Sequence, residues 1–365
     1  MRNREAAGFL LSILFVGLAA LRDVYFGGLF QRVHPLVVAV VAFALCPLVF
    51  LPMALLRDRA GLTALLRRPR ELLWINATTA LAWLSFFHAL RLAEPALVQV
   101  IFFGIGPLSV RWLDRLVPGA TASAPTLGER RLHVGLLAAL GLAAAVMLCG
   151  RSGLGPQPLG RVVVALALTA GGGLAISLST LLCRVVNDAG VPPAAVIGLR
   201  FPLAAVAGAG LATARGDVLA TVTPDLVPGV ALASLALIVL PNYVSQIGIA
   251  LASPLTVRAV LAVGPVLVFL LETLEGRLPA SPFTLLTCVI YGTFALTTAV
   301  GRLRQEVADE PTHGRRRQRR DVGLGAEPLG GGVVPAERRG RVGDRVAIHL
   351  EDAVDQVERD VRFRL

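Results

Sequence analysis

Apolar stretches of about 20 residues recur along most of the chain and are separated by short polar breaks. A helix needs about 20 mainly apolar residues to cross the hydrocarbon core of a bilayer. The pattern therefore predicts an all-α integral membrane protein with ten transmembrane helices. We place these helices at residues 8–30, 35–56, 72–90, 95–113, 132–149, 162–183, 193–212, 228–251, 254–271 and 282–300.

A weak internal similarity relates two of the predicted helices. Leu92–Pro95 opens the fourth helix, which reaches Gly106-Pro107, and Leu251–Pro254 opens the ninth, which reaches Gly264-Pro265. The two segments lie five helices apart, and an odd number of helices per repeat reverses the orientation of the second half. This predicts two inverted five-helix repeats, a design typical of secondary transporters. We expect Pro107 and Pro265 to bend their helices, although Gly-Pro is also merely tolerated in some membrane helices.

The internal similarity and a change in composition after about residue 302 divide the chain into three parts. Residues 1–150 form the first repeat and residues 151–301 the second. Residues 302–365 contain the run Arg315–Arg320, without another apolar span, and predict a basic, disordered cytoplasmic tail.

Charge adds an orientation to this picture. The net charge is +11, the chain has no lysine, and arginines concentrate at the N-terminus and after the second and fourth helices. Because positive residues stay on the cytoplasmic side, we expect both termini in the cytoplasm of a bacterium, with the helices in its inner membrane. This pattern makes membrane topology a better explanation of the arginines than nucleic-acid binding.

Known catalytic and metal-binding patterns are missing from the sequence. Cys46, Cys149, Cys183 and Cys288 lie in apolar runs without metal-type spacing, so we interpret them as small apolar side chains. Neither a metalloprotease nor a serine-hydrolase motif occurs, and no pair of acids has helical spacing inside a span. A membrane-embedded enzyme acting on lipids and a non-transporting scaffold remain as alternatives, and an enzyme is not the expectation.

Several local patterns resemble one transporter family. Phe86–Leu92 resembles the end of the third helix in the EamA-type branch of the drug/metabolite transporter superfamily, and the segment from Pro95 to Gly106-Pro107 resembles the helix that follows. Gly190–Pro193, with Arg200 seven residues later, resembles the entry to the seventh helix, and residues 132–149 have the glycine-rich character of the fifth.

The resemblance implies gradient-driven export or exchange of metabolites, amino acids or drugs. In one respect the chain departs from the pattern. The family's second helix often carries an arginine that matches the one in the seventh, whereas this chain has the uncharged Val41–Phe43 there. The basic group is therefore absent or is replaced by another residue such as Arg22.

Charged residues within the predicted spans are the first candidates for function, because burying them in a bilayer costs about 2.5–3.5 kcal/mol each. Arg22 and Asp23 lie inside the first helix. Since adjacent residues of a helix do not face each other, we expect each to find another partner. Asp23 is a candidate for proton coupling, with a static ion pair to Arg200 or Arg22 as the alternative. Arg200 and Arg258 are candidates to bind an anionic group, although Arg258 could instead extend to the cytoplasmic interface.

Polar and aromatic residues complete the candidate set. Gln99 matches Arg258 across the repeat, and Trp83 either stacks on a substrate ring or belongs to the core. The eighth helix offers Asn242, Tyr243 and Gln246. Helix-to-helix hydrogen bonding is the simpler role for Asn242 and for Asn76. Gly171–Gly173 predicts close helix packing.

The sequence therefore predicts a secondary active transporter that works by alternating access, with a central cavity between the two repeats. Its partners are a small-molecule substrate and the lipid bilayer, with a homodimer left open and no nucleic acid. No cofactor or metal is expected, and proton coupling through Asp23 is left open.

Overall fold

The computed structural model describes residues 2–113, 127–220, 222–251 and 260–298. The chain divides into two units, Met1–Val307 and Ala308–Leu365. All described residues belong to the first unit, which contains both predicted repeats. The predicted tail, 302–365, lies outside the described residues.

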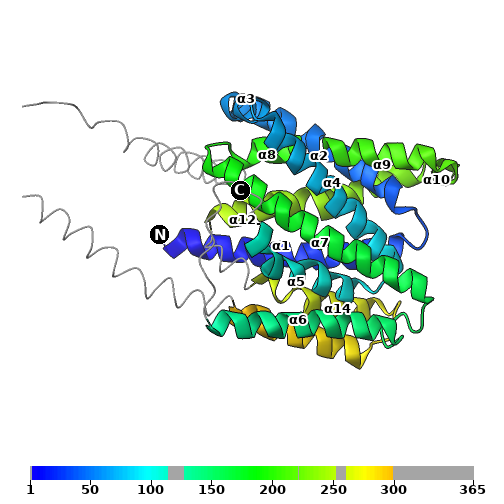
Figure 1. Ribbon diagram of the computed structural model, residues 1–365. Helices are drawn as coiled ribbons and strands as arrows, with labels where there is room; N and C mark the ends of the chain where they lie inside the picture. The colour runs from blue at the N-terminus through cyan, green and yellow to red at the C-terminus, as the bar shows by residue number, and fades with distance from the viewer. Residues whose placement is uncertain (1, 114–126, 221, 252–259, 299–365) are drawn as a thin grey trace, which may run out of the picture. The chain divides into compact units, whose positions relative to one another are not determined.

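The described residues form helices joined by turns and short loops, and they contain no strand. Figure 1 shows these helices packed side by side. In chain order they are α1 (Arg2–Leu29), α2 (Pro35–Arg57), α3 (Arg59–Leu66), α4 (Pro69–Leu92), α5 (Pro95–Leu113), α6 (Leu127–Leu148), α7 (Leu159–Asp188), α8 (Pro193–Arg200), α9 (Pro202–Ala214), α10 (Gly216–Ala220), α11 (Leu226–Ser234), the π-helix η2 (Leu235–Val239), α12 (Leu240–Leu251), α14 (Gly264–Glu275) and the helix Pro282–Thr298.

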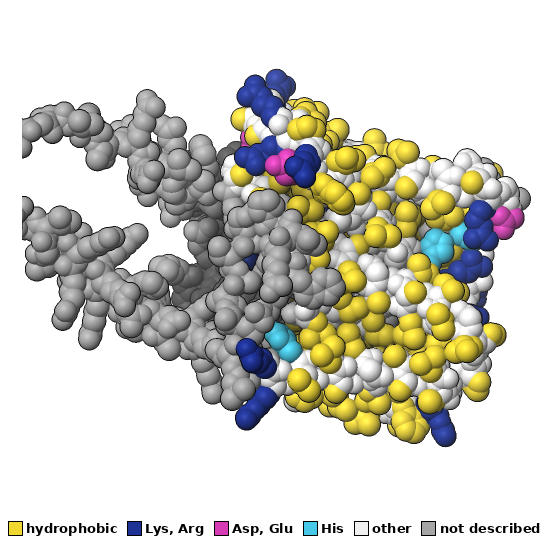
Figure 2. All heavy atoms as spheres, in the orientation of Figure 1, with side chains coloured by type: hydrophobic (Ala, Val, Ile, Leu, Met, Phe, Trp, Pro, Cys, Tyr) yellow, Lys and Arg dark blue, Asp and Glu magenta, His cyan; other side chains and the backbone are white. Residues whose placement is uncertain are grey.

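The protein is a membrane-embedded helical bundle. Seven of its described helical segments are long and apolar enough to cross a bilayer, and Pro95–Ser109 and Pro282–Thr298 are shorter apolar helices. On the face shown in Figure 2, hydrophobic side chains cover the middle of the bundle and charged side chains lie mainly towards its two ends. This is the surface expected where lipid replaces water around the middle of a protein.

Two predicted spans of the second half, 193–212 and 228–251, are not single regular helices. The span 193–212 is divided at Phe201 between α8 and α9, where Pro202 begins the new helix. The span 228–251 consists of α11, the π-helix η2 and α12, and η2 ends just before Pro241. Proline has no N–H to donate to the preceding turn, and the wider π-turn accommodates that loss.

The two Gly-Pro pairs differ in their local structure. Pro107 lies within α5, which continues as a helix to Leu113. Ala262 and Val263, by contrast, form a turn, and Gly264-Pro265 begins α14 after it. The predicted ninth helix, 254–271, lies partly outside the described residues, but its described part is interrupted just before Pro265.

Two ends of the bundle can be defined from contacts between loops. At one end, which we call the Glu94 end, residues 27–35, 91–95, 149–161 and 275–282 meet: Glu94 bonds to Gly153, Ser281 bonds to Arg151, and Gly27 lies against Pro95 and Arg277. At the other, the α3 end, Gly61 of α3 lies against Pro192, just before α8.

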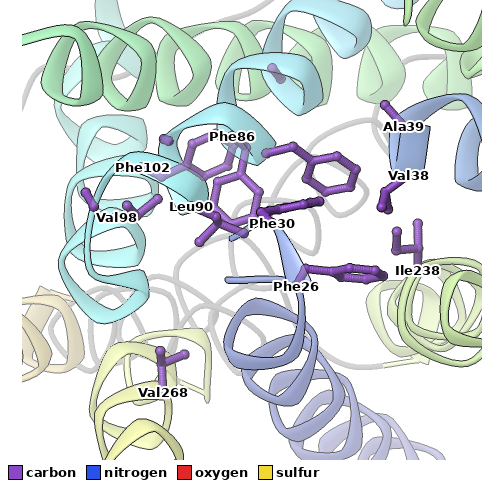
Figure 3. Close-up of a cluster of buried hydrophobic side chains, with 14 of the residues drawn as sticks. Phe26, Phe30, Val38, Ala39, Phe86, Leu90, Val98, Phe102, Ile238 and Val268 are labelled. Carbon is purple, nitrogen blue, oxygen red and sulfur yellow. The ribbon is translucent and has the colours of Figure 1, made fainter. Parts of the chain in front are cut away.

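Aromatic side chains form the core between α1, α2, α4 and α5. Figure 3 shows Phe30 of α1 close to Phe86 and Leu90 of α4, and Phe26 of α1 beside Ile238. The ring centroids of Phe30 and Phe87 are 5.2 Å apart, and those of Phe86 and Phe102 are 4.6 Å apart. Offset and edge contacts of this kind add about 0.5–1.5 kcal/mol per pair beyond the apolar area they bury.

The predicted packing role of Gly171–Gly173 is confirmed for two of the three glycines. A Cβ atom on Gly173 would lie 2.6 Å from the backbone oxygen of Phe102, and one on Gly172 would lie 3.2 Å from the backbone oxygen of Ala82. Gly171 has no neighbour within 4 Å of that position. Only glycine therefore lets α7 approach α4 and α5 closely enough for the contacts described below.

Candidate functional site

A charged pair is buried in the interior of α1. The Arg22 Nε donates to Asp23 Oδ1 at 2.6 Å, and Asp23 is completely buried. The expectation that these neighbours do not face each other is wrong, because the long Arg22 side chain folds back along α1 to reach Asp23. The second carboxylate oxygen, Oδ2, accepts from Gln99 Nε2 of α5 at 2.7 Å.

Two aromatic rings of α4 cover the Arg22 guanidinium. Its central carbon lies 5.1 Å from the centre of the Trp83 ring and 5.5 Å from that of Phe86. A cation over an aromatic face is attracted by the electron-rich ring, and the interaction strengthens when water is excluded. Arg22, Asp23, Trp83 and Gln99, all predicted from the sequence, thus meet in one buried cluster, which we call the Asp23 cluster.

The Asp23 cluster contains polar atoms that are buried without a hydrogen-bond partner. These atoms are Gln99 Oε1 and Trp83 Nε1, an acceptor and a donor. Leaving such a group unpaired costs about 1–3 kcal/mol, so proteins seldom retain one without a reason. A bound molecule with a donor and an acceptor of its own would satisfy both atoms.

A second arginine lies nearby without an acidic partner. Arg200, at the end of α8, is only 7% exposed and donates from Nε to Thr79 Oγ1 of α4 at 3.0 Å. The Thr79 hydroxyl in turn lies 2.9 Å from the Ser179 hydroxyl of α7. Within the described part of the chain no carboxylate forms an ion pair with Arg200. Among the described residues the Arg200 guanidinium is contacted by the Thr79 hydroxyl and by the Phe201 ring, 5.5 Å away.

The break between α8 and α9 is held open by Asn76 of α4. In a continuous helix Leu203 N would donate to Leu199 O, four residues earlier. Here Leu203 N donates to Asn76 Oδ1 at 3.3 Å, and Leu199 O accepts from Asn76 Nδ2 at 2.7 Å. The amide side chain is therefore inserted into the backbone hydrogen-bond ladder, which is a recognised cause of helix kinks. Because Arg200 lies within this break, Asn76 positions it.

One face of α4 connects both arginines. Asn76, Thr79 and Trp83 follow one another at spacings of three and four residues, so they share a face of the helix. Thr79 bonds to Arg200, and Trp83, about one helical turn further on, contacts Arg22. Arg22 and Asp23 neutralise each other, and Arg200 leaves one net positive charge along this face.

Towards the Glu94 end, the aromatic core covers the Asp23 cluster. Phe26 and Phe30 follow Asp23 along α1, and Phe87 and Leu90 follow Trp83 along α4 in the same direction. All four are buried, and the Phe26 and Phe30 rings stack with centroids 5.7 Å apart. In the conformation described, these buried side chains lie along α1 and α4 between the Asp23 cluster and the Glu94 end.

Two other predicted site residues, Tyr243 and Asn242, have their contacts outside the Asp23 cluster. Tyr243 of α12 stacks on Phe50 of α2, with centroids 6.0 Å apart. Asn242 donates to Ile238 O within its own helical segment, so it differs from Asn76, whose predicted helix-to-helix bond is confirmed. The Gln246 side chain and the whole of Arg258 lie outside the described residues.

Sequence reasoning missed four polar residues. Thr79 and Ser179 are single hydroxyl residues in apolar helices, and only their spacing from Trp83 and from the glycines of α7 distinguishes them. Glu94 lies between two predicted spans and Glu272 directly after another, so neither was selected as a site residue, yet both are buried. A weak signal was available for the two acids, since each lies next to or within a short polar break of the apolar pattern.

Comparison with known proteins supports the fold only. No protein-family model and no curated protein matches the chain. A solved structure described only as "Crystal structure of protein" resembles it with a TM-score of 0.55 and 21% sequence identity, over 84% of this chain and 99% of the other. A solved chain that this one covers almost completely thus shares the fold, and no activity follows from the match.

Proposed function

We propose that the protein is a secondary transporter of small organic molecules, which it moves by alternating access between two inverted five-helix repeats. The observation that carries the proposal is Arg200, a buried cation that has no carboxylate partner among the described residues and lies along the same face of α4 as the Asp23 cluster. Ionisable groups inside a bilayer are costly and usually mark the path of a substrate or ion. The resemblance to EamA-type drug/metabolite transporters agrees with this function.

The helix contacts support the inverted repeat. In a five-plus-five arrangement α1 corresponds to α7, α4 to the segment from α11 to α12, and α5 to the segment ending in α14. α7 contacts α4 and α5, and correspondingly α1 contacts α12 and α14. The pairs α2·α9 and α5·α14, which a twofold axis would map onto themselves, are also in contact. The first helix of each half thus packs against helices of the other half. This arrangement suits rocking of one half against the other.

Interrupted helices support transport as well. The breaks at Phe201, at η2 and at Ala262-Val263 all lie within predicted spans. Irregular backbone inside a membrane is tolerated where it is buried in protein or faces a cavity, and it commonly lies beside a binding site. The break at Phe201 meets this description, since it places Arg200 next to Thr79.

The substrate class follows from the groups that line this face of α4. The net positive charge favours an anionic or zwitterionic molecule, such as an amino acid or another metabolite with a carboxylate, which a guanidinium binds well. The Trp83 indole N–H, which is buried without a hydrogen-bond partner, would donate to the rest of the molecule. We further propose the inner membrane of a bacterium as the location, with both termini in the cytoplasm.

The test is untargeted metabolite analysis of cells and medium. It compares cells that express the protein with cells carrying an empty vector, and includes Arg200→Gln, Asp23→Asn and Arg184→Gln. Arg184 is an exposed arginine of α7 and provides the matched control. We expect compounds with a carboxylate to be redistributed across the membrane by the wild type and by Arg184→Gln, and not by Arg200→Gln.

The same experiment can reject the proposal. If the wild type is inserted in the membrane and redistributes no compound in either direction, transport is the wrong function. If transport occurs and Arg200→Gln at equal expression retains it fully, the buried arginine does not bind the substrate.

A further inference from the structure

A second buried polar group lies at the Glu94 end, separate from the Asp23 cluster. Glu272 of α14 is 3% exposed, and both of its carboxylate oxygens are buried without a hydrogen-bond partner. The backbone amide of Ala96 faces this carboxylate without reaching hydrogen-bonding geometry. An ionised carboxylate in such a place would lose its hydration and gain little in return.

Glu94 faces Glu272 from the other half of the chain. Its Oε2 accepts from Gly153 N at 2.7 Å and from Thr284 Oγ1 at 3.0 Å. Burial raises the pKa of Glu94, and these two bonds act in the opposite direction. Donated hydrogen bonds stabilise the charged form of a carboxylate. Of the two acids, Glu94 is therefore the better suited to remain ionised and Glu272 to hold a proton.

The remaining charged and titratable groups around Glu272 are few in the described structure. Arg277 attracts its charge, and Glu275 repels it, both from the C-terminal side of α14. Arg277 is itself bonded to Glu275, through Nε at 3.2 Å. From the helix Pro282–Thr298, Cys288 lies within electrostatic reach of both Glu94 and Glu272. The described groups do not include three His, Cys, Asp or Glu side chains placed to hold a metal ion.

We propose that Glu272 is a proton-binding site and that its proton keeps the Glu94 end of the bundle closed. With the proton bound, Glu272 is neutral and α14 packs against α1 and α5, as in the conformation described. When the proton leaves for water, two carboxylates from the two halves face each other in a poorly solvated place. Like charges there repel strongly, and separation of α14 from α5 relieves the repulsion.

This inference deepens the proposed function, on which its last step rests: opening of the Glu94 end is one half of an alternating-access cycle, and the proton is the coupling ion. The proton site and its effect on closure can nevertheless be measured without any substrate. Failure to find transport would therefore leave the proton site to be judged by its own experiments.

The first experiment detects the proton directly. Infrared spectra of the purified full-length protein are recorded as a function of pH, in the region where protonated carboxylic acids absorb. We expect one band at neutral pH that disappears in Glu272→Gln and persists in Glu275→Gln, whose carboxylate is partly exposed. If Glu272→Gln loses no band, Glu272 is ionised and the proposal is wrong.

The second experiment reports closure through Cys288, which is fully buried beside the two acids. Cys46, Cys149 and Cys183 are replaced by alanine, and the maleimide reactivity of Cys288 is measured against pH. We expect reactivity in the Glu275→Gln background to rise with pH as in the parent, and reactivity in Glu272→Gln to remain lower at each alkaline pH. Loss of the Glu272 negative charge would by itself favour the thiolate of Cys288 and raise its reactivity, so a lower reactivity in Glu272→Gln does not come from thiol ionisation. Equal reactivity of Glu272→Gln and the parent would show that Glu272 does not control closure.

Discussion

Arg22 and Asp23 are adjacent in sequence and form a buried ion pair, which has a testable energetic consequence. Removing one partner of such a pair leaves an uncompensated charge and costs about 3–5 kcal/mol, whereas removing both costs much less. We therefore expect Asp23→Asn to lower the unfolding temperature of the detergent-solubilised protein more than the double variant Arg22→Gln, Asp23→Asn does. Circular dichroism during heating measures both. A double variant less stable than Asp23→Asn would mean that Arg22 is stabilised mainly by Trp83 and Phe86.

Some residues of the candidate site could be predicted from the sequence, and others could not. Intramembrane charge and polarity were enough to select Arg22, Asp23, Trp83 and Gln99, because such groups are rare in apolar helices. The pattern did not indicate that Arg22 folds back on its neighbour, since rotamer and packing decide that. It also gave Thr79 no weight, because a threonine in an apolar helix is ordinary until an arginine from another helix reaches its hydroxyl.

At the scale of the element, the α8–α9 break depends on a side chain from a distant helix. Asn76→Ala should leave Leu199 O and Leu203 N without partners, at a cost of about 1–3 kcal/mol for each buried group. We expect a lower unfolding temperature and, in the transport assay, a loss of activity like that of Arg200→Gln. Asn242→Ala is the matched control, because its bond to Ile238 O lies within its own helical segment. Equal effects of the two substitutions would show that the insertion of Asn76 does not hold the break.

Packing of α7 gives a second prediction at this scale. Gly173→Ala would place a methyl group 2.6 Å from a backbone oxygen of α5, which cannot move alone, so we expect destabilisation of about 1–3 kcal/mol. Gly171→Ala meets nothing within 4 Å and should be neutral or stabilising by up to about 1 kcal/mol, since alanine favours helix. Thermal unfolding of the two variants decides the order. If Gly171→Ala is the more damaging, α7 does not pack through Gly173.

Helix positions could be predicted well from the sequence, and helix interruptions less well. The lengths of the apolar runs located α1, α2, α4 and α7 closely, because hydrocarbon thickness fixes the length of a span. The same reasoning treated 193–212 and 228–251 as single helices. Proline indicated that a break was permitted at Pro202 and Pro241, but whether a helix breaks depends on what satisfies the released backbone groups. At Pro202 the released backbone groups are paired by the side chain of Asn76, which is more than a hundred residues away along the chain.

For the whole molecule, the contacts place α3 at one end of the bundle and the start of α7 at the other. Arg161 Nη2, near the start of α7, donates to Arg91 O at 3.2 Å at the end of α4, whereas α3 lies beside the start of α8. If arginine-rich segments stay on the cytoplasmic side of the membrane, the α3 end faces the cytoplasm. The Glu94 end, with its acid pair, then faces outward, and a proton leaving Glu272 would be released on that side.

Single-cysteine labelling tests this orientation. Gly160→Cys and Ala60→Cys both place an exposed thiol at an end of the bundle, the first near the start of α7 and the second in α3. Each is made with Cys149, the exposed native cysteine, replaced by serine. In intact cells a membrane-impermeant maleimide should label Gly160→Cys and should label Ala60→Cys only after permeabilisation. The parent with Cys149→Ser should remain unlabelled, because its other three cysteines are buried. The opposite labelling order would show that the protein has the inverse orientation in the membrane. The closed Glu94 end would then open towards the cytoplasm.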